Sequence, residues 1–110
     1  MDANGFAFDI AQKPALLRRL AEHPYDWSAV RGQQLLFLGM GSSHFANATM
    51  AHMLNHASLT ARAVLASAQP LPACGSETSV IAVSATGNSV ETLAALEAVS
   101  SNAQKVAVTN

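Results

Sequence analysis

Two short segments of the sequence concentrate hydroxyl side chains and glycine where a helix is about to begin. The hydroxyls are those of Ser42, Ser43, Ser84, Thr86 and Ser89, and the glycines are Gly41 and Gly87. A hydroxyl group donates a hydrogen bond to a phosphate oxygen, and a glycine lets the backbone approach a ligand closely. The residue types in these segments therefore favour binding of a phosphate group.

The place of these segments at helix starts strengthens that interpretation. The first turn of a helix has N–H groups without partners inside the helix, and the helix dipole adds partial positive charge there. An anion is stabilised at such a position. No Asp or Glu occurs between Asp26 and Glu77, a stretch that contains the whole first segment, so repulsion of an anion is small there.

A second interpretation assigns the same serines a structural role. Serine is a common N-cap residue, and Ser42, Ser43 and Ser89 each stand close to a predicted helix start. For one segment alone, capping is the better explanation. Two such segments at one sheet edge favour a ligand site, and a serine can serve in both roles.

Nucleotide-binding motifs fail at particular positions. A dinucleotide fingerprint that begins at Gly39 needs a glycine at position 44, which is His44. Neither Lys13 nor Lys105 lies in a loop of the P-loop type. The sequence therefore predicts no cofactor. His44 is a candidate ligand contact or acid–base group, and the alternative is a solvent-facing or hydrogen-bonded histidine.

Metal and thiol chemistry are weakly supported. His52 and His56 have the spacing of a chelating pair, but the glutamate of the zinc-protease motif is absent, so we expect no metal site. Cys74 lies among Pro and Gly residues without a basic neighbour, which predicts an unreactive thiol.

Composition limits the classes of function. Half of the 110 residues are hydrophobic and 12% are charged, which is typical of a folded chain. A net charge of −1 argues against nucleic acid and anionic membrane surfaces as partners. No apolar stretch is long enough to span a membrane. The single cysteine and the absence of a signal-peptide pattern in the first ten residues predict a cytoplasmic protein.

Periodicity predicts alternating strands and helices. Apolar runs of strand length occupy 34–38, 61–65, 80–83 and 105–109. A first helix is expected from a cap at Asp9 to about His23, and a turn region over 25–33 follows it. Another helix covers 90–100. The helix after the first strand should face the core with Phe45, Ala46, Met50, Met53 and Leu54, the two methionines acting as core filler.

This order predicts an α/β fold with a parallel sheet and helices on both faces. Ligands of such sheets bind beyond the carboxyl ends of the strands, which is where both hydroxyl segments lie. The sequence ends at Asn110, where a turn and a covering helix would normally follow, so about four strands are present and the domain looks incomplete. The open edge of the last strand predicts a homo-oligomer.

The hydroxyl segments also carry a resemblance. Leu36–Ser43 (LFLGMGSS) and Val83–Thr92 (VSATGNSVET) resemble the SIS (sugar isomerase) domain family. Ile10–Pro14 (IAQKP) resembles the lead-in to the isomerase half of glucosamine-fructose-6-phosphate aminotransferases, and Val108–Asn110 resembles the end of the family's fourth strand. The resemblance implies a flavodoxin-like parallel sheet, with a helix and lead-in over 1–33 and the first part of a SIS domain over 34–110.

The resemblance also implies a set of site residues. The family's first turn, Gly-Thr-Ser or Gly-Ser-Ser, falls on Gly41–Ser43, and its second, Ser-Gln-Ser-Gly-Glu-Thr, falls on Ser84–Ser89. The hydroxyls that contact phosphate in the family are kept in this chain. Ala85 and Asn88 replace the family's Gln and Glu, and are expected as further ligand contacts whose sugar-ring interactions differ.

The expected function is binding of a phosphorylated sugar. The glutamate and lysine that catalyse isomerisation in the family fall beyond Asn110, so no catalytic residue is assigned. One alternative is a sugar-phosphate isomerase, aminotransferase or deaminase whose catalytic residues come from a longer chain or a partner. Another is the sensor domain of a sugar-responsive regulator, which would need a helix-turn-helix ahead of the sheet.

Overall fold

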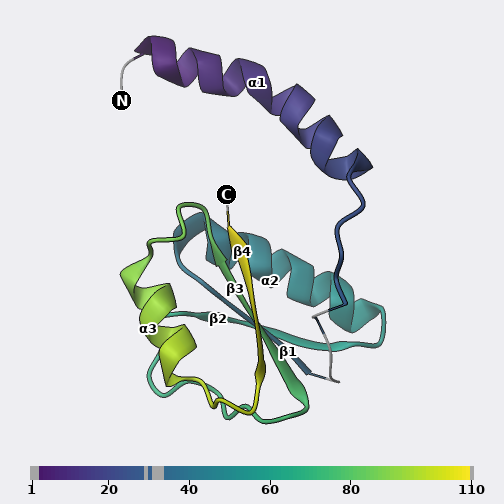
Figure 1. Ribbon diagram of the computed structural model, residues 1–110, viewed down its shortest axis with the longest axis vertical. Coiled ribbons are helices and arrows are strands. Elements are labelled where there is room, and N and C mark those ends of the chain that lie inside the picture. The colour runs from purple at the N-terminus through teal and green to yellow at the C-terminus, as the bar shows by residue number, and fades with distance from the viewer. Residues whose placement is uncertain (1–2, 29, 31–33, 110) are drawn as a thin grey trace.

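A computed structural model describes residues 3–28, 30 and 34–109 of the chain (Figure 1). Helices and strands alternate along most of it. Their order is α1 (Ala3–Glu22), β1 (Gln34–Gly39), α2 (Gly41–His56), β2 (Thr60–Leu65), β3 (Thr78–Ser84), α3 (Val90–Ala98) and β4 (Gln104–Thr109). The predicted order of elements is confirmed.

The strands form one parallel sheet in the order β2-β1-β3-β4. In the central pairing, Leu36 of β1 lies opposite Val80 of β3. The chain leaves β1 through α2 toward one side of the sheet and leaves β3 through α3 toward the other, so strand order reverses between β1 and β3. The carboxyl ends of these two strands therefore border the crevice at which such sheets bind ligands.

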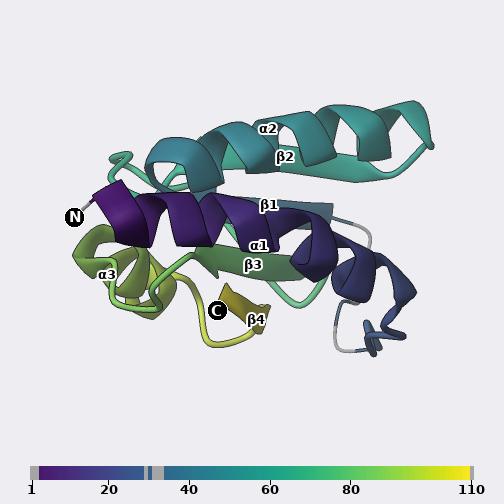
Figure 2. The ribbon, with the colours of Figure 1, turned by 90° about the horizontal axis from the view of Figure 1, so that it is seen from above.

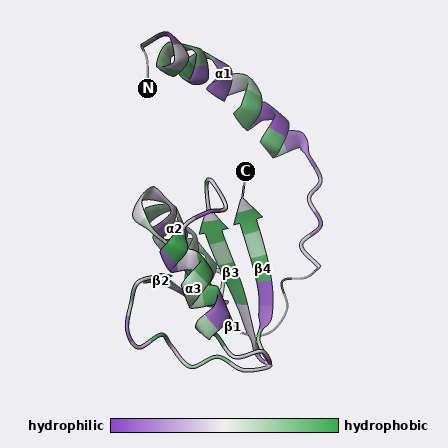
Figure 3. Ribbon diagram, turned by 60° about the vertical axis from the view of Figure 1, so that its left-hand side comes forward, coloured by the Kyte–Doolittle hydropathy of each residue, from purple (hydrophilic) through white to green (hydrophobic). Residues whose placement is uncertain are grey.

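Each face of the sheet has its own apolar layer. Leu36, Leu38 and Val80 point to one face and pack with Ala95 of α3. Because successive side chains of a strand alternate between faces, Phe37 and Ile81 point to the other, where they pack with α2. Figure 3 shows the apolar stretches of β3 and β4 beside each other. The prediction of helices on both faces of the sheet is confirmed.

The core-facing side of α2 was predicted correctly only for Leu54, which is half-buried and packs against the core layer on this face of the sheet. The buried residues of α2 are Asn47 and Ala51, whereas Phe45 is 73% exposed and Met53 is 59% exposed. The expected core positions Phe45, Ala46 and Met53 are therefore wrong. Met50, 44% exposed, is likewise no core filler.

Helix α1 begins earlier than predicted, and it is the one described helix without a buried residue. It starts at Ala3, so Asp9 lies within the helix and is not its cap, and the helix continues through Pro14. None of its residues is buried. Figure 1 shows α1 beyond the carboxyl ends of the strands, and Figure 2, seen from above, shows it lying across them. Leu20, near the end of α1, borders a hollow together with residues of β4.

The remaining boundaries differ slightly from the predictions. Strand β3 begins at Thr78 rather than 80, because the buried Thr78 and Ser79 continue it although they are polar. Helix α3 ends at Ala98 rather than 100. Positions 29 and 31–33 of the predicted turn region, and Asn110 at the expected end of the last strand, lie outside the described residues. No helix in the described part of the chain has the length and apolar character needed to cross a membrane.

Candidate functional site

The two hydroxyl segments meet at the carboxyl edge of the sheet, around the crevice between β1 and β3. There a hollow of about 380 Å³ is lined by residues from the start of α2 and from the ends of β3 and β4: Ser42, Ser43, Ala46, Val83, Ser84, Ala85, Val108 and Thr109. Three of the predicted site hydroxyls, those of Ser42, Ser43 and Ser84, thus lie around one space. Ala85 also lines it.

The first segment opens α2 without a side-chain cap. The N-cap residue is Met40, which has extended backbone angles and forms no side-chain cap bond. Its carbonyl oxygen accepts a hydrogen bond from the Ser43 N–H at 3.1 Å. Ser42 and Ser43 therefore lie in the first helical turn, not at the cap. The capping interpretation is wrong for these two serines, whose hydroxyls remain accessible to a ligand at the helix start.

Gly41 is needed for its backbone conformation. Its φ of 55° lies in the left-handed region that other residues adopt at a cost, while no described atom lies within 4 Å of the place where a Cβ would stand. The space beside Gly41 is open. The backbone at the start of α2 is therefore both tightly turned and uncovered.

The second segment is held by its own hydroxyls. The Ser84 hydroxyl oxygen accepts a hydrogen bond from the Gly87 N–H at 3.1 Å, and that of Thr86 accepts one from the Asn88 N–H at 3.1 Å. Each hydroxyl keeps its own proton available for donation. Thr86, Gly87 and Asn88 do not line the hollow, so this segment reaches it through Ser84 and Ala85.

Ser89 is the N-cap of α3. Its hydroxyl oxygen accepts a hydrogen bond from the Thr92 N–H at 3.3 Å. The capping interpretation is thus confirmed for this serine. It is not among the residues that line the hollow.

Three buried side-chain atoms near this edge have no hydrogen-bond partner among the described residues. They are His44 Nδ1, Asn47 Nδ2 and Thr92 Oγ1. All three belong to the first two turns of α2 or the first turn of α3. The sequence interpretation included His44 but missed Asn47 and Thr92. The available signal was polarity at a helix position that faces the sheet.

The electrostatics of the hollow come from the backbone. Among the described residues that line it, none carries a charged or imidazole side chain. The start of α2 supplies partial positive charge, and the serine hydroxyls supply donors. This arrangement can bind and orient an anion, but it contains no group that would serve as a general acid or base near neutral pH.

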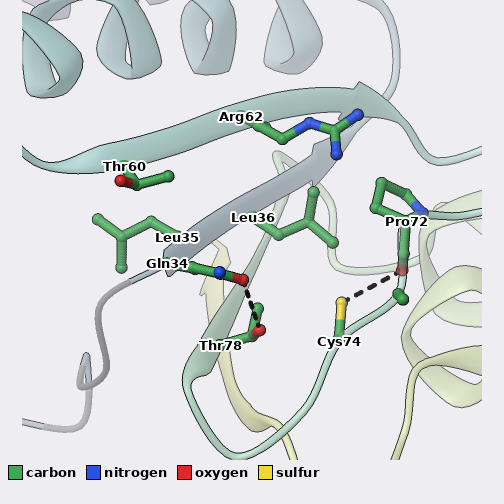
Figure 4. Close-up of a pocket in the computed structure, with 9 residues that line it drawn as sticks. Gln34, Leu35, Leu36, Thr60, Arg62, Pro72, Cys74 and Thr78 are labelled. Atoms are coloured by element: carbon green, nitrogen blue, oxygen red, sulfur yellow. Dashed lines mark hydrogen bonds between the residues drawn. The ribbon is translucent and has the colours of Figure 1, made fainter.

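A separate cavity of about 170 Å³ lies on the α3 side of β1 and β2 (Figure 4). Arg62 and Cys74 border it, and Thr78 donates a hydrogen bond to Gln34 Oε1 at 3.4 Å. Burial raises the pKa of the Cys74 thiol, and the nearby charge of Arg62 partly opposes this effect. Arg62 is a basic neighbour that the local sequence around Cys74 did not predict. The raised pKa nevertheless favours the protonated, unreactive thiol near neutral pH.

The two histidines of α2 lie close together, but no third metal-binding side chain joins them among the described residues. The rings of His52 and His56 lie 5.1 Å apart on the exposed side of the helix. Within the described residues, no group of three or more His, Cys, Asp or Glu side chains is placed to hold a metal ion.

Comparison with solved structures supports the fold. The chain is similar to a hypothetical protein with 18% identity and a TM-score of 0.65, over 84% of this chain and 53% of that one. It is also similar to a hypothetical protein from Methanococcus jannaschii with 14% identity and a TM-score of 0.69, over 94% of this chain and 63% of that one. The chain thus spans about half to two thirds of these proteins.

For the Methanococcus jannaschii protein, a molecular function as 3-hexulose-6-phosphate isomerase was inferred from its structure. At such low identity, both similarities establish the fold alone. A comparison with curated proteins found no match. The SIS domain family, by contrast, matches residues 30–110, which include the whole sheet and both hydroxyl segments. The chain therefore belongs to the SIS domain family.

Proposed function

We propose that this chain binds a phosphorylated sugar in the hollow between α2 and the ends of β3 and β4. The observation that carries the proposal is the meeting of Ser42, Ser43 and Ser84 around one space at the start of a helix. The two serines of α2 are not occupied as caps. The proposed ligand carries its phosphate at the helix start and its sugar toward the outer part of the hollow.

The phosphate oxygens accept hydrogen bonds from the free N–H groups of the first turn of α2 and from the hydroxyls of Ser42 and Ser43. Ser84 donates from the other side of the crevice. A hydrogen bond to a charged group contributes about 1.5–3 kcal/mol. Gly41 keeps the backbone open to the phosphate, while Thr86, Gly87 and Ser89 hold the shape of the second segment.

His44, Ala85 and Asn88 are proposed as secondary contacts. Ala85 borders the hollow, so it faces the sugar without offering a side-chain hydrogen bond. Asn88 is exposed beside the second segment, and His44 is half-buried behind the first. These residues contribute less than the three serines that line the hollow.

A second candidate function is sugar-phosphate isomerisation by a longer protein. It is supported by the inferred isomerase function of the Methanococcus jannaschii structure and by the fact that this chain covers 63% of that protein. The described hollow offers binding groups but no acid or base, so the groups that move protons would come from residues beyond this chain or from a partner. The resemblance of Ile10–Pro14 to the lead-in of the isomerase half of aminotransferases fits this same candidate.

Thermal unfolding of the chain in millimolar fructose 6-phosphate or glucosamine 6-phosphate tests the binding proposal. A ligand that binds the native state stabilises it by about 2.7 kcal/mol at a concentration one hundred times its Kd. We expect a rise in Tm that is lost in a Ser42→Ala, Ser84→Ala double variant. Thr49→Ala, an exposed change on the same helix, should keep the rise.

Two results would reject the proposal. One is a cooperative transition of the original chain that no phosphosugar shifts. The other is an equal shift in the original chain and in the double serine variant, which would place the binding site elsewhere.

A further inference from the structure

Asn47 is a buried polar residue whose place in the core has no structural explanation. Its side chain is 3% exposed, and its amide nitrogen has no hydrogen-bond partner among the described residues. Native proteins leave few buried donors unpaired, and each such group calls for an explanation. Asparagine is also a poorer helix former than alanine, so this position departs from two preferences at once.

Asn47 does not line the hollow itself, and its amide lies close behind residues that do. The point at which a Cβ on Gly39 would stand is 2.9 Å from Asn47 Nδ2, 3.1 Å from Ser43 Cβ and 3.2 Å from the Val83 carbonyl oxygen. Ser43 and Val83 both line the hollow. The amide therefore lies beside Gly39 at the end of β1, directly behind the part of the wall that Ser43 and Val83 form.

Packing alone does not require asparagine here. Ala51, one turn further along α2, is buried against the sheet and shows that a small apolar residue serves on this face. An alanine at position 47 would leave no polar atom unpaired. A buried polar residue that breaks a local rule without a structural gain points to function.

We propose that Asn47 is a ligand-binding residue whose amide N–H group donates to an oxygen atom of the bound phosphosugar. This inference rests on the proposed function of the hollow. The two serines of α2 hold the phosphate from the helix start. Asn47 donates to the ligand oxygen that enters deepest between Ser43 and Val83, where the ligand displaces the side chains that cover the amide in the free protein. The amide requires an acceptor and offers no charge, so it distinguishes ligands by shape and oxygen position rather than by charge.

The proposal predicts opposite effects on stability and on binding. In Asn47→Ala the unpaired donor is removed and helix propensity improves, so the Tm of the free protein should be unchanged or higher. Affinity for fructose 6-phosphate should fall about tenfold or more, since one hydrogen bond to the ligand is lost. A purely structural residue would show a lower Tm and an unchanged affinity.

The experiment measures Tm without ligand and Kd by calorimetry for the original chain, Asn47→Ala, Asn47→Ser and Thr49→Ala. Serine keeps a donor, so Asn47→Ser should retain more affinity than Asn47→Ala, and it also serves if the alanine variant does not fold. Thr49→Ala, exposed on the same helix, should match the original chain. Each protein is titrated with fructose 6-phosphate and with inorganic phosphate.

The two ligands separate the possible oxygen atoms. If Asn47→Ala weakens both ligands, the amide donates to a phosphate oxygen, and if it weakens only fructose 6-phosphate, the amide donates to a sugar oxygen. Either result supports the proposal. Equal affinity of Asn47→Ala and the original chain for both ligands overturns it while leaving the phosphosugar site intact. Absence of binding to the original chain overturns both the site and the role of Asn47.

Discussion

Replacing both Ser42 and Ser43 with alanine separates the ligand role of these serines from a capping role. Because Met40 is the N-cap of α2, the two hydroxyls contribute nothing to the cap of the helix. Alanine is the better helix former by up to about 0.7 kcal/mol per residue, so the free protein should gain between about 0 and 1 kcal/mol. A loss of caps would instead cost about 1 kcal/mol for each serine.

The same double change should weaken binding strongly. A hydrogen bond to a charged group contributes about 1.5–3 kcal/mol, so removal of two should raise Kd at least about one hundredfold. Urea unfolding followed by circular dichroism measures the stability of the free protein, and calorimetric titration with fructose 6-phosphate measures the affinity. The two effects have opposite signs, which no general damage to the fold would produce.

Ser89→Ala is the matched control, since Ser89 does cap a helix. It should lower stability, as the double serine variant should not. The reasoning is refuted if the double variant loses 1 kcal/mol or more of stability by the cap estimate and binds the phosphosugar as tightly as the original chain.

Four more specific predictions concern Ser89, Gly39, Cys74 and helix α1. Ser89→Ala should cost about 1 kcal/mol of unfolding free energy in urea, and an unchanged midpoint would contradict its role as the cap of α3. Gly39→Ala should cost about 1–3 kcal/mol by overpacking, because its Cβ would stand 2.9 Å from Asn47 Nδ2; full stability would show that the amide moves freely. Burial raises the pKa of the Cys74 thiol in the folded protein. The contribution of this group to the free energy of unfolding is therefore fully present below the pKa of an unfolded thiol, and it is lost as pH rises through the pKa of the folded state. Iodoacetamide should accordingly alkylate the native chain at pH 8 more slowly than the urea-unfolded chain, and equal rates would argue against this shift. Deletion of residues 1–22 should change Tm by only a few degrees, since no residue of α1 is buried, whereas a large loss would mean that α1 supports the sheet.

The sequence predicted the sheet well because its strands are apolar runs. Leu36–Leu38 of β1 and Val80–Ala82 of β3 are buried in the sheet, and such apolar runs stand out against polar turns. The additional β3 residues Thr78 and Ser79 escaped notice because they are buried although polar. Burial in the sheet, which the local sequence does not encode, decided that boundary.

The helix faces were harder to predict. Large apolar residues of α2 have helical spacing, but the residues buried next to the sheet are Asn47 and Ala51, with Leu54 half-buried beside them. The exposed Phe45 and Met53, like the apolar residues of α1, lie on surfaces whose partners the periodicity of one helix does not reveal. Homo-oligomer formation, which was expected from the open edge of the last strand, stays a prediction.

The candidate site was predicted in part. The types of residue in the two hydroxyl segments were sufficient to expect that Ser42, Ser43 and Ser84 would lie at one sheet edge, and they border one hollow. The distinction between cap and first helical turn was not accessible, because it depends on the backbone angles of Met40. Asn47 was missed because its burial depends on how α2 lies on the sheet.

An NMR titration of the ¹⁵N-labelled chain with fructose 6-phosphate tests the central claim most directly. We predict that the largest saturable changes in amide chemical shift fall on residues 41–46, 83–85 and 108–109, which include all the residues that line the hollow. Changes concentrated around the cavity beside Arg62 and Cys74, or no saturable change at millimolar ligand, would contradict a phosphosugar site at the carboxyl edge of the sheet.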